Sequence, residues 1–166
     1  MSRYRLLCAF IVAVALFLGG CGNFITPELG VVAKKESRIL IKDLVDKDAV
    51  FQTGDLKLNY SLVEMEGEYR YAGVVDFDRS LTDSFSTIVK FYLKMSFLDS
   101  EGRVLETVDV TPFFSYLNNI PLEMKIKKDG ISPYGASGIV FNYLGLFRGA
   151  TRDITEDWEI IYFPFE

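Results

Sequence analysis

Apolar and polar side chains alternate one for one along much of the chain after residue 55. In the clearest run Leu56, Leu58, Tyr60 and Leu62 are separated by Lys57, Asn59 and Ser61. A period of two residues places the apolar side chains on one face of an extended strand, whereas an α-helix requires a period of 3.6. No segment of the mature chain keeps the helical period over three turns. The sequence therefore predicts an all-β fold.

Further strands follow from the same pattern and from the turn residues between them. We predict strands at 37–45, 56–62, 69–77, 85–98, 104–110, 122–128, 139–147 and 158–163, turns at 53–55, 64–67, 99–102 and 128–130, a polar loop at 78–83 and a second loop at 132–138. Thr111-Pro112 is typical of a helix start and predicts one or two helical turns within 112–118. This order favours an antiparallel immunoglobulin-like β-sandwich of seven to eight strands with a short connecting helix, and a small β-barrel is the alternative.

The first twenty residues have a different character. Arg3 and Arg5 precede thirteen uncharged residues, 6–18, which are mostly large and apolar. A membrane-spanning helix needs about 20 apolar residues, so this run is too short to be an anchor and fits the apolar part of a secretory signal. The remaining alternatives are ordinary signal cleavage and a retained N-terminal anchor.

The apolar run ends in Leu18-Gly19-Gly20-Cys21, which resembles the lipobox of bacterial lipoproteins. The resemblance implies that the thiol of Cys21 is diacylated, that the signal peptide is cut between Gly20 and Cys21, and that the new amine is acylated too. It divides the chain into a signal peptide at 1–20, a lipidated tether at 21–35 and a single β-sandwich domain at 36–166. Gly22 stands where an aspartate would retain a lipoprotein in the inner membrane, so the resemblance implies an outer-membrane rather than an inner-membrane address.

Composition removes several classes of function. The chain has no histidine, and its two cysteines are Cys8, within the signal, and Cys21. This excludes Ser-His-Asp and Cys-His catalysis and His-ligated zinc, and it leaves the mature domain without a disulfide. The net charge of −5 falls to −7 once Arg3 and Arg5 are cleaved off, which makes nucleic acid a poor partner. We expect no enzyme activity, no cofactor and no metal ion.

Residues 69–111, about a quarter of the chain, resemble the FxLYD-like and related immunoglobulin-like domains of bacterial envelope proteins. The similarity is carried by Tyr71-Ala72-Gly73-Val74-Val75, by the strand at 89–98, and by the hairpin Asp99-Ser100-Glu101-Gly102-Arg103-Val104. Asp76 stands in place of the usual asparagine, and Leu98 in place of the usual aromatic residue. The resemblance implies a sandwich hairpin without shared catalytic residues.

Two groups of residues are candidates for contact with a partner or ligand. Aromatic side chains in connecting segments often mark recognition surfaces, although they can instead close one end of a sandwich. The basic residues on the strand at 122–128 either protect an edge strand from pairing or contact an acidic partner or a lipid headgroup. The candidates are Phe113, Phe114, Tyr116 and Tyr134, together with Lys125 and Lys127.

These observations lead to one functional hypothesis and one alternative. The first is a lipid-anchored envelope protein without enzyme activity, which has an accessory, assembly or structural role through contacts with another envelope protein. The alternative is a lipoprotein that binds a glycan or small molecule on its loop aromatics. The sequence leaves the partner and the oligomeric state open.

Overall fold

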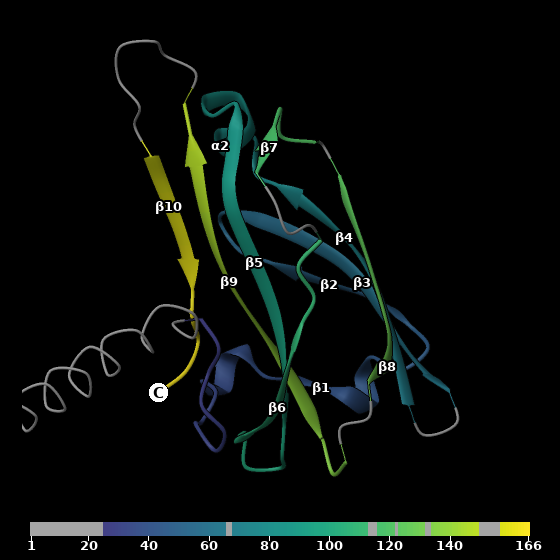
Figure 1. The fold of residues 1–166 in the computed structure, drawn as a ribbon. Helices are drawn as coiled ribbons and strands as arrows, with labels where there is room; N and C mark the ends of the chain where they lie inside the picture. The colour runs from purple at the N-terminus through teal and green to yellow at the C-terminus, as the bar shows by residue number, and fades with distance from the viewer. Residues whose placement is uncertain (1–24, 66–67, 113–115, 122, 132–133, 150–156) are drawn as a thin grey trace, which may run out of the picture.

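The domain is a β-sandwich of two antiparallel sheets (Figure 1). The computed structural model describes residues 25–65, 68–112, 116–121, 123–131, 134–149 and 157–166. The predicted sandwich is confirmed, and the strands of the two described sheets do not close into the alternative small barrel. The described residues form ten strands rather than seven or eight, because β2 and the two-residue strand β7 add to the eight ranges that the sequence predicted.

The sheet nearer the viewer in Figure 1, here called the front sheet, is built around two long neighbouring strands, β9 and β5. On the far side of β9, β1 pairs with its beginning and β10 with its end, while β6 and β7 pair with the two ends of β5. Its strands are β1 (Ile39–Leu40), β5 (Thr87–Leu98), β6 (Val104–Asp109), β7 (Leu117–Asn118), β9 (Gly138–Arg148) and β10 (Asp157–Tyr162).

The other sheet, here called the back sheet, has the order β2-β3-β4-β8. Its strands are β2 (Asp48–Gln52), β3 (Leu56–Met65), β4 (Glu68–Phe77) and β8 (Met124–Ile131). β3 buries Leu56, Leu58, Tyr60 and Leu62 as the alternation predicts, and β8 forms one edge. The lysines on β8 therefore lie where they discourage pairing with another chain.

Aromatic rings join the two sheets. Phe141 on β9 lies with its ring centroid 5.1 Å from Phe51 on β2, 5.0 Å from Tyr60 on β3 and 6.3 Å from Tyr71 on β4. Such pairs contribute about 0.5–1.5 kcal/mol each beyond the burial of apolar area. Because Phe141 contacts three strands of the back sheet and is fully buried, it is central to the packing between the sheets.

The predicted polar loop at 78–83 is instead a short helix, α2 (Arg79–Ser84). Asp78 is its N-cap, and its carboxylate accepts a hydrogen bond of 2.8 Å from the backbone N–H of Ser80. The loop prediction was wrong because an aspartate in this position satisfies an otherwise unpaired helix N–H. Hydrogen bonds from the Ser80 side chain and, next, from its backbone N–H hold the pKa of the Asp78 carboxyl below its usual value.

The turn predicted at 128–130 was also wrong, because β8 continues through it. The register of β8 against β4 shifts between Tyr69 and Tyr71, and Gly130 has a φ of 72°. The chain thus forms a β-bulge, for which glycine at positive φ is well suited. Pairing with β4, which is distant in sequence, keeps residues 128–130 in the strand. The local sequence Lys-Asp-Gly carries no information about that pairing.

The structure also differs from prediction in two connecting segments, at 37–45 and at 112–118. Within the predicted strand at 37–45 the only strand is β1, and Val45 forms an isolated bridge to Leu62. Lys35–Ser37 and Ile41–Asp43 are 3₁₀ turns, and Ile41 and Leu44 lie in the core. The helical turns predicted for 112–118 fall partly on 113–115, outside the described residues. At 117–118 the prediction is replaced by β7, which pairs with Thr87 and Ile88.

We expect Phe141→Ala to lower the free energy of unfolding by about 3–5 kcal/mol, because it removes a buried ring that contacts three strands. Val50→Ala is the control, since Val50 is 57% exposed and its loss should change stability by less than about 0.5 kcal/mol. Urea unfolding of the mature domain, followed by circular dichroism, measures both. Equal losses in the two variants would contradict the packing described here.

Stability should fall at alkaline pH. Burial raises the pKa of Tyr60 to about 12, and it also raises the pKa values of Tyr71 and Tyr143. A phenol with a raised folded pKa contributes stability that is complete below the unfolded pKa of about 10 and is lost as pH rises through the folded value. The free energy of unfolding should therefore fall between about pH 10 and pH 12.

Tyr60→Phe separates this effect from packing. The Tyr60 hydroxyl is buried without a hydrogen-bond partner among the described residues, so its removal should leave stability at pH 8 nearly unchanged. The alkaline fall should become shallower. A loss above about 1 kcal/mol at pH 8, or an unchanged alkaline slope in urea unfolding, would show that the hydroxyl has another role.

Candidate functional site

The segment 25–34, here called the N-terminal segment, lies on the outer face of the front sheet. Its backbone is paired on both sides: Ala33 N–H donates to the Gly102 carbonyl at 2.9 Å, Val104 N–H donates to Val31, and Lys34 N–H donates to Pro164. These are ladder-like bonds to the β5–β6 hairpin and to the C-terminal end of the chain. Most of the segment expected as a tether is thus held on the domain.

The hairpin that receives this segment has the predicted form. Asp99 accepts hydrogen bonds of 2.8 Å from the N–H groups of Glu101 and Arg103, and Gly102 has the expected positive φ of 88°. These bonds, with that of Arg103 first, lower the pKa of the Asp99 carboxyl. A methyl group on Gly102 would also collide with the guanidinium of Arg38, which donates to the Ala33 carbonyl.

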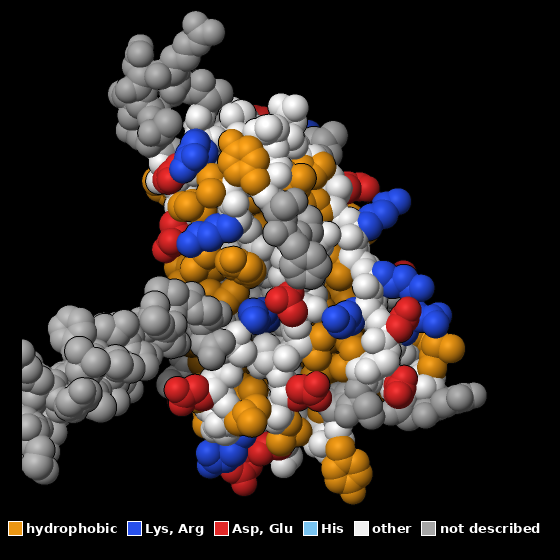
Figure 2. All heavy atoms as spheres, in the orientation of Figure 1, with side chains coloured by type: hydrophobic (Ala, Val, Ile, Leu, Met, Phe, Trp, Pro, Cys, Tyr) orange, Lys and Arg blue, Asp and Glu red, His pale blue; other side chains and the backbone are white. Residues whose placement is uncertain are grey.

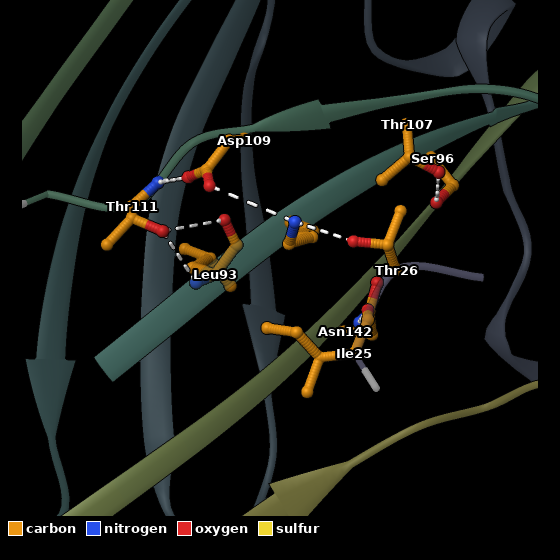
Figure 3. Close-up of polar contacts among 9 residues, drawn as sticks. Ile25, Thr26, Leu93, Ser96, Thr107, Asp109, Thr111 and Asn142 are labelled. Atoms are coloured by element: carbon orange, nitrogen blue, oxygen red, sulfur yellow. Dashed lines mark hydrogen bonds and ion pairs between the residues drawn. The ribbon is translucent and has the colours of Figure 1, made fainter. Parts of the chain in front are cut away.

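Polar contacts fix where the N-terminal segment begins (Figure 3). The side-chain amide of Asn142, fully buried at the middle of β9, donates a 2.5 Å hydrogen bond to the carbonyl of Ile25. Beside it, the ammonium of Lys94 donates to Thr26 Oγ1 at 2.7 Å and lies 3.9 Å from a carboxylate oxygen of Asp109. Burying a polar side chain in mid-strand costs free energy unless it is hydrogen-bonded, and the Asn142 N–H group meets this need through Ile25, while Asn142 Oδ1 has no partner among the described residues. The contacts from Asn142 and Lys94 thus position Ile25 and Thr26 at this point of the sheet.

Thr111, just after the end of β6, extends this hydrogen-bond network to the backbone of β5. Thr111 Oγ1 donates to the Leu93 carbonyl and accepts from the Leu93 N–H, while the Thr111 N–H donates to Asp109 at 2.9 Å. The threonine side chain thereby replaces a strand neighbour for the backbone of Leu93 (Figure 3). The backbone N–H of Thr111 also holds the Asp109 carboxylate near the ammonium of Lys94.

The docking of Ile25 leaves only a short connection, residues 22–24, between Cys21 and the folded domain; this connection is here called the leash. Only residues 22–24 separate Cys21, at the predicted cleavage site after Gly20, from the docked Ile25. An extended chain advances at most about 3.6 Å per residue, so Cys21 lies within about 14 Å of Ile25. Any group attached to Cys21 is therefore confined to the neighbourhood of the outer face of the front sheet.

The back sheet carries a shallow groove of about 600 Å³ on its opposite, outer face. The paired strands place two cross-strand rows there, Asp48–Ser61–Ala72–Lys127 and Val50–Asn59–Val74–Lys125. Small side chains at the middle of the rows leave the hollow, while longer ones stand at the edge strands. The groove joins an acidic edge at β2 to a basic edge at β8, with apolar and amide groups between them.

Gly73, which lines the groove, has no side chain to occupy the space beneath the sheet. A Cβ there would lie 3.0 Å from the Tyr71 hydroxyl and 3.3 Å from the Asn59 carbonyl oxygen. The missing side chain makes room for the buried ring of Tyr71, which has no hydrogen-bond partner for its hydroxyl among the described residues. Sequence reasoning missed the groove because it depends on the register of four strands.

The structure separates most of the predicted contact residues. Tyr116 is half exposed next to β7, at the beginning of β5, whereas Tyr134 is fully exposed in the loop that meets the end of β5. With the length of β5 between them, these two tyrosines do not form one binding platform. Phe113 and Phe114 lie outside the described residues.

The two predicted contact lysines lie close together on β8, at the groove of the back sheet. Lys125 lines the groove of the back sheet, and Lys127 stands beside it in the neighbouring row, with its ammonium 3.4 Å from Asp129. Asp129 also accepts a 2.6 Å hydrogen bond from Arg70, which is the first cause of the lowered pKa of its carboxyl. Lys125 and Lys127 are therefore the predicted contact residues that the fold brings together.

Within the described ranges, no helix has the length and apolar character needed to cross a bilayer. The chain matches no family model, no curated protein and no solved structure.

Proposed function

We propose that this protein is a lipid-anchored envelope lipoprotein, held at the periplasmic face of the outer membrane through Cys21, with a non-enzymatic assembly or accessory role. The observation that carries the proposal is the Leu18-Gly19-Gly20-Cys21 sequence at the end of an uncharged apolar run. Only three residues separate Cys21 from the docked Ile25, which gives further support, because an acyl group on Cys21 then joins closely to a folded domain. Two or more acyl chains hold a protein on a membrane stably.

The groove of the back sheet is the surface that we assign to a protein partner. It has apolar floor residues, an exposed amide at Asn59 and opposite charges at its two edges. Such a mixture of apolar area and fixed polar groups is typical of protein interfaces. The groove lies on the side of the sandwich opposite the anchored segment, so a partner reaches it without displacing the lipid.

Cys21→Ser tests the anchor. We expect the wild-type protein, purified from membranes, to have the mass of a chain that begins at Cys21 and carries acyl groups. The serine variant should remain an unprocessed precursor or appear without lipid, because the acyl acceptor is gone. Mass spectrometry and membrane fractionation measure both, and a wild-type protein that still begins at Met1 would refute the proposal.

A photo-crosslinking residue at position 59 tests the partner surface in intact cells. Asn59 is exposed in the groove, while Glu64, exposed near the end of the same strand, lies outside it and serves as the control. We expect a discrete heavier adduct from position 59 that is weak or absent from position 64. No adduct at 59, or equal adducts at both positions, would count against a partner in the groove.

A further inference from the structure

The outer face of the front sheet has a cross-strand row that the core does not use. Strand register places Tyr92, Leu144 and Ile161 side by side across β5, β9 and β10. Tyr92 is 42% exposed and Ile161 47% exposed, and Leu144 between them is buried. Phe163, which follows β10, is 39% exposed, and its ring centroid lies 4.8 Å from that of Phe165. Figure 2 shows apolar side chains exposed over these strands among basic and acidic ones.

We propose that this row, Tyr92–Leu144–Ile161, lies against the bilayer surface, so that the sandwich rests on its front sheet. The inference rests on the lipid anchor of the proposed function and adds to it the orientation of the domain. The occupant of the patch is the headgroup region of the membrane to which Cys21 is attached.

The leash supports this orientation. Cys21 lies within about 14 Å of Ile25, and Ile25 is bound to Asn142, which is two residues from Leu144 on the same face of β9. The acyl chains therefore leave the domain beside the exposed row. A membrane that holds these chains is close to the row in every arrangement that the leash allows.

Strand length opposes the upright alternative. Asn142 is the fifth of eleven residues in β9, so it lies about 14 Å from the Gly138 end and about 20 Å from the Arg148 end. Loops extend beyond the strand ends, as the fully exposed Tyr134 shows at one of them. A fully stretched leash of about 14 Å only equals the shorter of these lengths, so it does not reach headgroups that lie beyond the loops, whereas contact through the sheet face leaves it slack.

The charges near the row suit an interface rather than the bilayer interior. Lys90 and Glu159 both flank Leu146 in the next row, and Arg148 forms a two-bond ion pair with Asp157, at 2.7 and 2.9 Å. The neighbourhood is thus balanced in charge, and it presents a tyrosine, whose ring is apolar and whose hydroxyl stays hydrated. Such a surface can rest among headgroups without burying an unpaired charge.

Cysteine labelling of the full lipidated protein tests the orientation. After processing Cys8 is lost and Cys21 is acylated, so one introduced cysteine is the only free thiol. We choose Ile161→Cys and, as a second position on another strand, Tyr92→Cys. Val50→Cys is the matched control, because Val50 is an exposed aliphatic residue on the outer face of the opposite sheet. Each variant carries a fluorophore and is added to vesicles of phosphatidylethanolamine and phosphatidylglycerol with nitroxide-labelled headgroups.

We expect headgroup nitroxides to quench the fluorophores at positions 161 and 92 at least about twofold more than the fluorophore at position 50. Flotation of the same samples reports the anchor independently. Protein that floats with the vesicles but is quenched equally at all three positions would overturn the orientation and leave the anchor intact. Protein that does not float would overturn the anchor, and the orientation with it.

Discussion

The fold depends on the burial of β9 on both of its faces. Toward the back sheet it presents Ile139, Phe141, Tyr143 and Phe147, which are all buried in the main core. Toward the outside it presents Val140, which packs with Ala33, Leu98, Val104 and Phe165 in a second, smaller cluster. A sandwich has only two layers, so the second cluster requires additional chain, and the two ends of the chain supply it. The outer face of β9, at the centre of the front sheet, is therefore covered in part by the N-terminal segment and by Phe165 near the other end of the chain.

This arrangement makes the N-terminal segment part of the domain and gives the molecule two different faces. The front face receives the segment that leads to Cys21 and has the exposed apolar row beside it. The back face has the groove between Asp48 and Lys125. Asn142 links the proposed lipid anchor to the proposed orientation of the domain, because its hydrogen bond to Ile25 fixes the point at which the leash begins.

The fold was largely predictable, since the alternation at 56–62 and the hairpin at 99–102 are local patterns that tertiary packing then uses unchanged. Asp78 also gave a local signal, a helix cap, but it was interpreted as part of a loop. The bulge at Gly130 was not predictable in this way, because it arises from the pairing of β8 with β4. β2 was missed because Asp48–Gln52 is short and only half buried, with little contrast between its two faces.

The candidate site was less predictable than the fold. The apolar residues Ile25, Val31 and Ala33 were a usable signal that the predicted tether packs on the domain. Pro27 and Gly30, which are turn residues, are however typical of a linker, so the composition of this segment pointed both ways. The aromatic residues were chosen for their position in connecting segments, and Tyr116 and Tyr134 turned out to lie at opposite ends of β5. The groove needs the register of β2, β3, β4 and β8, which the sequence of any one strand does not contain.

The central claim is that residues 25–34 are docked on the front sheet. Amide hydrogen exchange of the mature protein, followed residue by residue by NMR, tests it most directly. The N–H groups of Gly30, Ala33 and Lys34 are bonded to the hairpin and the C-terminal end, so they should exchange as slowly as the neighbouring amide of Val104. Exchange of these three amides at the rate of an unstructured chain, with Val104 still protected, would show that the segment is a free tether and would contradict the account.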